Sequence, residues 1–193
     1  MTEVKKQQLL DKKVLRRQIL AARDALSEEE RKRAALFLTE RICGHQWFYM
    51  ADTVLTFVSY GSEIDTTDIL REALAKGKKV YAPKVTGQDM VFYRICSEKD
   101  LVLGYKGIRE PVGDTEPFLY DPTATDRVLM LMPGAVFDLQ KNRIGYGKGF
   151  YDRYLADKEE LRLKTIAVGF QCQMVEELPA NDWDIKPYQV ICV

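Results

Sequence analysis

Thr53-Val-Leu-Thr-Phe-Val-Ser-Tyr60 is the segment that best indicates the class of fold. β-Branched and aromatic residues dominate it, and its apolar run is too continuous for a strand with one face in water, so we expect a buried strand. An amphipathic helix is predicted next, over Asp65–Lys76, closed by Gly77. A short strand, Lys79–Ala82, follows it. Strand, helix and strand at this spacing predict a βαβ unit with a right-handed crossover and a sheet that is at least partly parallel.

The same pattern continues on both sides of this unit. Further strands are predicted at Met90–Ile95, Arg127–Met132, Thr165–Phe170 and Gln189–Val193. Helices are predicted at residues 5–26, from the capping box of Ser27 and Glu30 to Cys43, at Glu98–Leu103 and at Gly149–Asp157, with a proline-rich loop over Ile108–Thr125. We therefore expect one α/β domain over residues 1–193: a three-layer α/β/α sandwich with a mixed, mostly parallel sheet and a ligand cleft at the carboxyl ends of its strands.

Composition narrows the class of protein. Lys and Arg total 29 and Asp and Glu total 29, so the formal net charge is zero, which gives no support for nucleic acid or an anionic membrane as a partner. There is one histidine, His45, which we expect to be structural, so a Ser-His-Asp triad or a histidine-rich metal site is not expected. The cysteines are scattered without metal-site spacing. No secretory signal and no apolar run of roughly 18 residues is seen, so we expect a cytoplasmic protein with reduced thiols.

The densest chemical signal is Arg143-Ile-Gly-Tyr-Gly-Lys-Gly-Phe-Tyr-Asp152, in which three glycines alternate with larger residues. Glycines let backbone amides approach an anion, and Arg143 and Lys148 supply positive charge, so we predict a phosphate-binding loop. It is neither a Walker A loop nor a dinucleotide fingerprint, and a plain flexible turn is the alternative. Asp152 falls in the first turn of the following helix, where it is either a Mg²⁺ ligand beside phosphates or a carboxylate that favours the helix dipole.

Other candidate residues lie far away along the chain. Lys12 and Arg16 are four residues apart on one side of a helix and suit a polyphosphate, although a solvated basic face is the commoner role for such a pair. Glu63 follows the first buried strand, where open α/β sheets bind ligands; an inconsequential turn acid is equally compatible with its position. Asp182 and Asp184 add carboxylates near the C-terminus, with an acidic surface loop as the alternative.

Short stretches from end to end of the chain, in this order, resemble one known family. They are Lys12-x-x-x-Arg16, Phe57-Val-Ser-Tyr-Gly-Ser-Glu-Ile-Asp-Thr66, Tyr81-Ala-Pro-Lys84, Gly107-Ile-Arg-Glu-Pro111, Met132-Pro-Gly-Ala-Val-Phe-Asp138, the glycine loop with its continuation to Leu155, and Asp184-Ile-Lys-Pro187. The glycine loop is the most specific of them. The family is the 5-formyltetrahydrofolate cyclo-ligases, also called methenyltetrahydrofolate synthetases.

This resemblance implies an enzyme that uses ATP and Mg²⁺ to convert 5-formyltetrahydrofolate to 5,10-methenyltetrahydrofolate, with release of ADP and phosphate. The ATP contacts it implies are Lys12, Arg16, Arg143, Ile144, Gly145, Tyr146, Gly147, Lys148, Gly149, Phe150 and Tyr151. The folate contacts it implies are Val58, Glu63, Tyr146, Gly147, Lys148, Gly149 and Phe150. The metal carboxylates would be Asp152 and Asp184, with Asp182 as an alternative to the second. Asn142 and Phe150 depart from the family's usual glycine and tyrosine and put only fine geometry in doubt.

In the reaction that the resemblance implies, the formyl oxygen attacks the γ-phosphate, N10 of the folate closes the ring, and phosphate leaves. The substrate supplies its own nucleophiles, so the protein needs only to align its ligands and neutralise the transferring phosphoryl group. We assign that catalytic role to Arg143 and Lys148. The expected partners are small-molecule substrates only, bound by a monomer. The alternatives are a non-catalytic folate- or nucleotide-binding paralogue and an unrelated phosphate-binding module associated with RNA.

Overall fold

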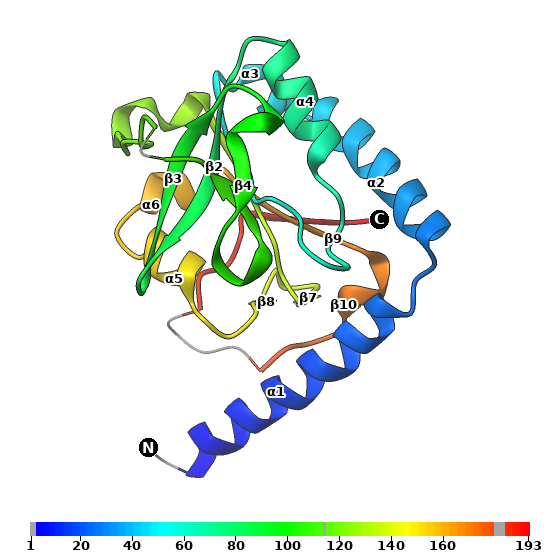
Figure 1. The fold of residues 1–193 in the computed structure, drawn as a ribbon. Coiled ribbons are helices and arrows are strands. Elements are labelled where there is room, and N and C mark those ends of the chain that lie inside the picture. Colours follow the sequence, from blue (N-terminus) through cyan, green and yellow to red (C-terminus); the bar gives the residue numbers. More distant parts are fainter. Residues whose placement is uncertain (1–2, 114, 180–183) are drawn as a thin grey trace.

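The structure is a computed structural model that describes residues 3–113, 115–179 and 184–193. Within these residues six strands form a central sheet in the order β11-β9-β6-β1-β2-β3 (Figure 1). Their bounds are β1 Thr53–Leu55, β2 Lys79–Thr86, β3 Asp89–Ile95, β6 Val128–Met132, β9 Thr165–Gly169 and β11 Gln189–Cys192. Every neighbouring pair is parallel except β2 and β3, which are antiparallel. The prediction of a mixed, mostly parallel sheet is therefore confirmed.

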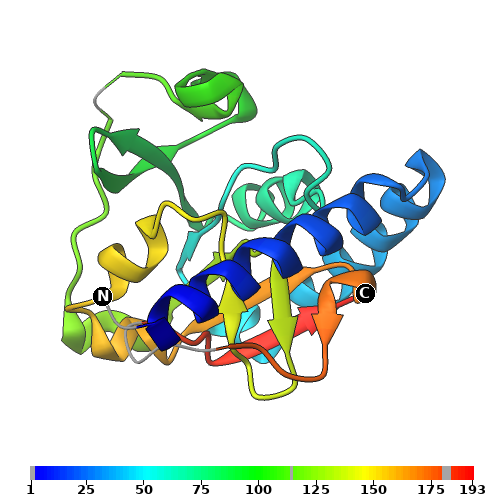
Figure 2. The same cartoon turned by 90° about the horizontal axis from the view of Figure 1, so that it is seen from below.

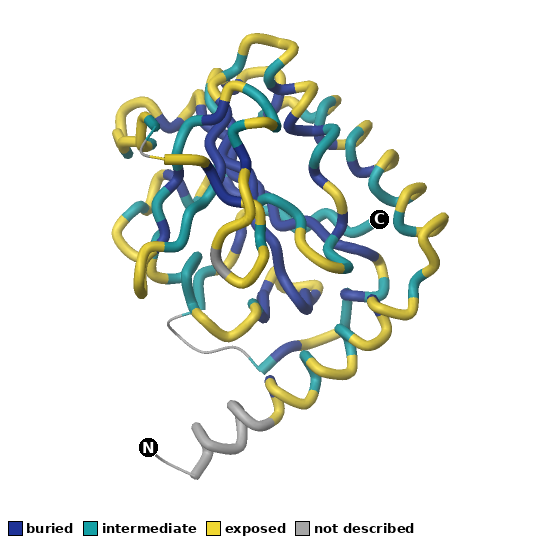
Figure 3. Tube along the Cα trace, viewed as in Figure 1, coloured by how far each residue is buried: buried dark blue, intermediate teal, exposed yellow. Residues whose placement is uncertain are grey.

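Helices cover both faces of this sheet, as the three-layer prediction requires. Side chains of one strand alternate between the faces: Val54 lies in one apolar core and Leu55 in the other. The first core is covered by α2 (Glu28–Cys43), α3 (Gln46–Met50) and α4 (Thr67–Ala75), and the second by α5 (Phe150–Leu155) and α6 (Glu159–Arg162). The central strands are the most deeply buried part of the molecule (Figure 3).

A second, small sheet was not expected from the sequence. It joins β10 (Met174–Val175), β7 (Val136–Asp138) and β8 (Arg143–Ile144). Helix α1 (Glu3–Asp24) lies across it, with Leu15, Ile19 and Leu20 packed against Ala135, Val136, Ile144 and Leu178 (Figure 2). Strands of two or three residues are too short to show a period of two, so this sheet exists only through its tertiary contacts. It brings α1 up to the glycine loop, which directly follows β8.

Two predicted elements need correction. The predicted helix over 98–103 is wrong, because only the 3₁₀ turn η1 (Glu98–Asp100) forms there and the chain continues as strand β4 (Leu101–Leu103). β4 pairs with β5 (Arg109–Pro111), which lies inside the predicted loop. Short 3₁₀ turns also occur as η2 (Tyr105–Gly107), η3 (Pro122–Arg127) and η4 (Gln171–Gln173). The resulting β4–β5 hairpin projects from the body of the molecule (Figure 2).

The predicted strand over 53–60 is also too long, since β1 ends at Leu55. Side chains bind the backbone beyond that point: the Thr66 hydroxyl donates to the Phe57 carbonyl at 3.0 Å, and the Ser59 hydroxyl donates to the Ile64 carbonyl at 2.7 Å. Such bonds compete with strand pairing and hold residues 57–66 as a loop at the carboxyl end of β1. This loop carries Glu63.

Gly134 marks a close approach between β6 and the small sheet. A Cβ atom at this position would lie 2.5 Å from two ring atoms of Phe137 and 3.1 Å from the Cγ of Arg143. We therefore expect Gly134→Ala to lower the free energy of unfolding by about 1–3 kcal/mol through overpacking. Urea denaturation of the variant and the wild type measures this, and equal midpoints with equal slopes would show that the close approach is not a constraint.

Candidate active site

A cavity of about 530 Å³ opens at the carboxyl ends of the central strands, where the sequence predicts the ligand cleft. Phe57 and Val58, just beyond β1, and Pro133, just beyond β6, form part of its wall. Val85 and Met90 of the β2–β3 pair form another part. The rest comes from α1, the β4–β5 hairpin, the glycine loop and α5. Loops beyond the carboxyl ends of β1 and β6 thus contribute to one hollow, as expected for an open α/β sheet.

The glycine loop forms one side of the cavity. It leaves β8 at Ile144 and enters α5 at Phe150. Gly147 has a φ of +91°, which other residues rarely adopt, and a Cβ atom there would lie 3.1 Å from an Nη atom of Arg16. The loop therefore needs glycine at this position to let the Arg16 guanidinium approach its backbone. This contact joins α1 to the loop, which sequence spacing alone does not show.

Arg143 lies at the base of the cavity and is buried, with 4% of its side chain exposed. One Nη donates to Asp152 Oδ1 at 3.0 Å, and the other donates to the Pro133 carbonyl at 3.3 Å. Its Nε is buried and has no hydrogen-bond partner among the described residues. The guanidinium also lies 5.7 Å from the ring centre of Tyr151. A buried cation with an unused donor in a cavity wall is suited to an anionic ligand.

Lys12 and Arg16 are not a solvated face, which corrects the commoner interpretation of their spacing. Lys12 is 7% exposed and forms an ion pair with Asp184. Arg16 is partly buried, its Nε is buried without a hydrogen-bond partner in the described part of the chain, and burial lowers its pKa. Both cations are on the side of α1 that faces the loop and the C-terminal segment. Helix α1 thus brings positive charge to the edge of the site.

The two predicted metal carboxylates are brought near each other. Asp152 Oδ1 accepts a hydrogen bond of 3.2 Å from the backbone N–H of Ile185, the residue after Asp184. Asp152 is paired with Arg143, and Asp184 with Lys12. Asp182 lies outside the described residues. Within the described residues, no group of three or more His, Cys, Asp or Glu side chains is placed to hold a metal ion by itself.

Glu63 lines the same cavity, in a tight turn. Its Oε2 accepts the backbone N–H of Tyr60 at 3.0 Å, and its carboxyl group is also hydrogen-bonded to the Tyr146 side chain. Burial raises the pKa of Glu63, while these hydrogen bonds and the charge of Arg23 oppose the rise. Burial also raises the pKa of Tyr146, so its hydroxyl stays protonated at neutral pH. The turn therefore presents a carboxyl group to the cavity with part of its hydrogen-bonding capacity already used.

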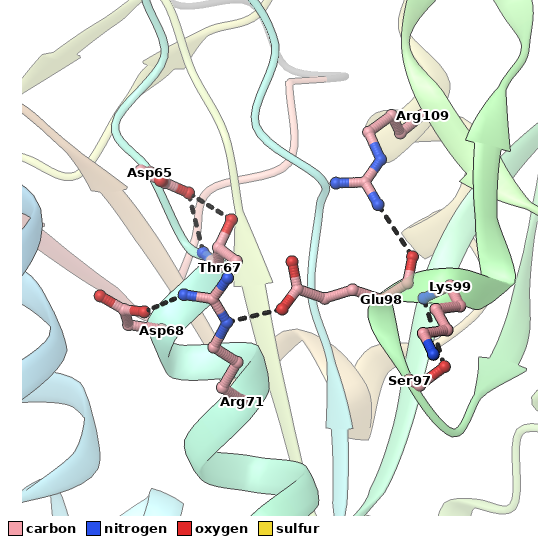
Figure 4. A network of polar contacts seen from close by, with 8 residues as sticks. All are labelled: Asp65, Thr67, Asp68, Arg71, Ser97, Glu98, Lys99 and Arg109. Carbon is pink, nitrogen blue, oxygen red and sulfur yellow. Dashed lines mark hydrogen bonds and ion pairs between the residues drawn. The ribbon is translucent and has the colours of Figure 1, made fainter.

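The β4–β5 hairpin contributes a wall that the sequence did not predict. Lys106, Ile108, Arg109 and Glu110 all line the cavity. Two sets of contacts hold the hairpin in place. Glu110 Oε1 accepts the Val85 N–H at 3.0 Å, while Arg109 donates to the Glu98 carbonyl at 2.8 Å, and the Glu98 side chain accepts from Arg71 of α4 at 2.5 Å (Figure 4). The wall is therefore anchored to both β2 and α4.

Most of the predicted site residues meet at this cavity. Those that line it are Val58, Glu63, Arg143, Gly145, Tyr146, Lys148, Gly149, Phe150, Tyr151 and Asp152. Gly147 contacts Arg16 just outside it, and Lys12 and Asp184 pair with each other. The Ile144 side chain is buried against α1 instead of facing the cavity. The predicted roles of these residues stay predictions, but the fold brings their positions together.

Comparison with known proteins places the chain in a family. The model described as the 5-formyltetrahydrofolate cyclo-ligase family matches residues 8–193, nearly the whole sequence. This chain belongs to that family. The mouse 5-formyltetrahydrofolate cyclo-ligase is 30% identical over 189 residues, covering 93% of this chain and 92% of its own. The enzyme of the same name from Escherichia coli K12 is 31% identical and covers 84% of this chain and 90% of its own.

Solved structures agree with this family assignment. The structure of 5,10-methenyltetrahydrofolate synthetase from Aquifex aeolicus has a TM-score of 0.77 and 35% identity, covering 91% of this chain and 86% of its own. A 5,10-methenyltetrahydrofolate synthetase from Mycoplasma pneumoniae, at 24% identity and a TM-score of 0.72 over 94% of this chain and 98% of its own, shares the fold. These relatives carry enzyme names, so the comparisons give no support to a non-catalytic paralogue.

Arg23 is the cyclo-ligase site residue that sequence reasoning missed. It is 6% exposed, lines the cavity from α1, and donates to the Tyr146 hydroxyl at 2.6 Å. A signal was present: Arg23 is seven residues after Arg16, so both fall on one side of the same helix. The number of other basic residues in this helix concealed it.

Proposed function

We propose that this protein is an ATP-dependent 5-formyltetrahydrofolate cyclo-ligase that forms 5,10-methenyltetrahydrofolate and releases ADP and phosphate. One observation carries the proposal. The glycine loop is the family's most specific stretch, and its residues Arg143, Lys148 and Asp152 line the same cavity as Val58 and Glu63. A phosphate-binding side and a folate-binding side thus share one hollow of about 530 Å³, within the usual range for small-molecule sites. Family membership supplies the identity of the two substrates.

The proposed chemistry needs positioning and charge more than it needs a protein nucleophile. The formyl oxygen bonds to the γ-phosphorus as the bond to ADP breaks. N10 then bonds to the activated carbon and loses its proton, the C–O bond to phosphate breaks, and the proton leaves with the phosphate. Arg143 at the cavity base and Lys148 on the loop neutralise the phosphoryl group in transfer. Arg16 and Lys12, at the edge of the loop, hold the outer phosphates of ATP. The Nε of Arg143 is buried and has no hydrogen-bond partner among the described residues, so this guanidinium keeps unused hydrogen-bonding capacity.

The folate occupies the wall formed by Val58, Glu63 and Tyr146. Val58 supplies apolar contact for the pterin ring. Glu63 accepts hydrogen bonds from the pterin amino and ring N–H groups with the acceptor capacity that Tyr60 and Tyr146 leave unused. N10 and the formyl group then lie toward the glycine loop. The loop holds them next to the γ-phosphate of ATP. Phe150 and Gly149 complete the contact between the two subsites.

The residues also fit Mg²⁺. Magnesium prefers one or two carboxylates together with phosphate oxygens, and Asp152 and Asp184 are neighbours whose negative charge is neutralised here by Arg143 and Lys12. These two aspartates would hold the ion. When bound, Mg²⁺ neutralises charge on the ATP phosphates. Arg143 and Lys12 are then free to bind phosphate oxygens themselves.

A spectrophotometric assay tests the proposed function. Purified protein is mixed with 5-formyltetrahydrofolate, ATP and Mg²⁺, and the near-ultraviolet absorbance of the methenyl product is followed, with ATP omitted as the control. We expect growth of the band only with ATP, and equimolar phosphate release. Folded protein that binds both ligands without forming product would contradict the proposal and favour a binding protein.

A monomeric, cytoplasmic enzyme acting only on small molecules completes the proposal. No helix in the described residues is long and apolar enough to cross a membrane. Size-exclusion chromatography with light scattering checks the state: a mass near 22.2 kDa is expected.

The raised pKa of Glu63 predicts that folate affinity depends on pH. Burial raises the pKa of Glu63 above the ordinary value for a glutamate. As the pH falls through this raised pKa, the carboxylate takes up a proton and can no longer accept hydrogen bonds from the pterin N–H groups as an anion. Folate affinity should fall over that range, and Glu63→Gln should lower it roughly 10- to 100-fold at neutral pH and remove the pH dependence. The free energy of unfolding of the free protein depends on pH in the opposite direction. A pKa that is raised in the folded state stabilises the fold at low pH, and that contribution is lost as pH rises.

Isothermal titration of 5-formyltetrahydrofolate between pH 5 and 8 measures this effect. Glu177→Gln, at an exposed position, is the matched control. An affinity with the same pH profile in Glu63→Gln and the wild type would exclude Glu63 as the pterin acceptor.

A further inference from the structure

Arg23 joins three segments that are distant in the sequence. From α1, its Nε donates to the Ser62 hydroxyl at 2.9 Å and one Nη donates to the Tyr146 hydroxyl at 2.6 Å. Ser62 in turn donates to Asp24, and Tyr146 is hydrogen-bonded to Glu63. The guanidinium also lies 5.7 Å from the ring centre of Tyr146. A single buried side chain thus connects α1, the turn at 60–63 and the glycine loop.

This placement differs from that of Arg16 and Lys12. Those cations approach the outer edge of the loop, whereas Arg23 lines the cavity itself and faces the side chains assigned to the folate. Tyr146 is the loop residue in contact with both Arg23 and Glu63. The residue is 42% exposed, so protein contacts on only part of the ring and at the hydroxyl set the direction of its side chain. Removing the guanidinium would leave the Tyr146 hydroxyl bonded to Glu63 alone and the Ser62 hydroxyl without its buried donor.

We propose that Arg23 is a positioning residue for the cyclo-ligase reaction: it fixes the Tyr146 ring and the Glu63 carboxylate in the geometry that receives the pterin, and so ties folate binding to the placement of the ATP-binding loop. The proposal rests on the proposed function. Arg23 acts through Tyr146 and Glu63 and needs no contact with the transferring phosphoryl group. A fork of fixed donors suits this role, because it holds two hydroxyl groups in one relative orientation.

The charge of Arg23 supplies a readout that a purely structural role would not move. Its positive charge lowers the pKa of Glu63 against the effect of burial. The charged or titratable side chains that interact with Glu63 are Arg23 of α1, Tyr146 of the loop and Tyr151 of α5. The other charged side chains that line the same cavity are Asp24, Lys106, Arg109, Glu110, Arg143, Lys148 and Asp152. Loss of Arg23 removes the positive charge that lowers the pKa of Glu63, so Glu63 should take up its proton at a higher pH.

The experiment compares Arg23→Met and Arg23→Lys with Arg17→Met, a matched control that removes an exposed arginine from the same helix. We expect Arg23→Met to weaken 5-formyltetrahydrofolate binding at least 10-fold, with the dissociation constant for ATP changed less than 3-fold, and Arg17→Met to change neither. Arg23→Lys should restore the pKa of Glu63 but not the folate affinity, since lysine keeps the charge and lacks the fork.

The pKa of Glu63 is measured by ¹³C NMR titration of its side-chain carboxyl in the ligand-free protein, so this arm does not depend on enzyme activity. An upward shift in Arg23→Met that is absent in Arg23→Lys supports the proposal. An unshifted Glu63 together with wild-type folate affinity in folded Arg23→Met overturns it. If the wild type binds folate and ATP but makes no product, the proposed function fails while the role of Arg23 is still decided by these two measurements.

Discussion

Replacement of Arg143 by methionine should lower kcat about 10³-fold while leaving the fold intact. Removal of one preorganised donor or of an arginine that stabilises phosphoryl transfer costs factors of this size. Arg143 is a buried cation of the cavity wall, with 4% of its side chain exposed, and its Nε has no partner among the described residues. It therefore acts in a water-poor environment, where a charge interacts more strongly. Methionine keeps a similar length and apolar packing against Tyr151.

The measurement is single-turnover formation of the methenyl product at saturating ATP and folate. Arg143→Lys should recover only a small part of the rate, because lysine cannot bond Asp152, Pro133 and a phosphate in one plane. Arg127→Met is the matched control: Arg127 is also ion-paired, to Asp52, but at the opposite ends of β1 and β6. Normal turnover in folded Arg143→Met would exclude the phosphoryl-clamp role.

Asp152→Asn should lower turnover at physiological Mg²⁺ about 10²-fold and raise the Mg²⁺ concentration needed for half-maximal activity. Asparagine keeps the shape of the side chain and an oxygen that can accept the Arg143 and Ile185 N–H bonds. The change therefore removes charge from the proposed metal site with little effect on packing. Excess Mg²⁺ should restore part of the activity.

The Mg²⁺ dependence of the variant distinguishes a metal ligand at Asp152 from a side chain that only orients Arg143. If Asp152 only orients Arg143, turnover falls but the Mg²⁺ dependence of Asp152→Asn matches that of the wild type, which would contradict the metal assignment. Asp126→Asn is the control, since Asp126 is an exposed carboxylate paired with Lys164 and distant in sequence from the loop. The Mg²⁺ dependence of ATP binding in the absence of folate gives a second readout that does not require turnover.

Long apolar segments were predictable, and short paired ones were not. The run that begins at Thr53, the helix after Asp65 and the capping box at Ser27 all carry a periodic or capping signal. Each forms an element of the expected type, although the strand ends at Leu55 and is shorter than predicted. The β4–β5 hairpin and the small sheet carry none: Arg143–Ile144 becomes a strand because β7 lies beside it. Their existence depends on backbone partners far away in the sequence, which no local pattern reveals.

The sequence by itself determined the fold class, the family and the chemical character of the site. Side-chain type and spacing suffice for these, because glycines beside Arg143 and Lys148 suit phosphate wherever the loop lies, and the long motifs are specific. Only the tertiary structure decided which charges act together. It buried Lys12 against Asp184, Arg143 against Asp152 and Arg23 against Tyr146. Burial and pairing are properties of surfaces that meet only after folding. The sequence of α1 alone therefore favours a solvated basic face, whereas in the folded chain this helix forms part of the wall of the candidate active site.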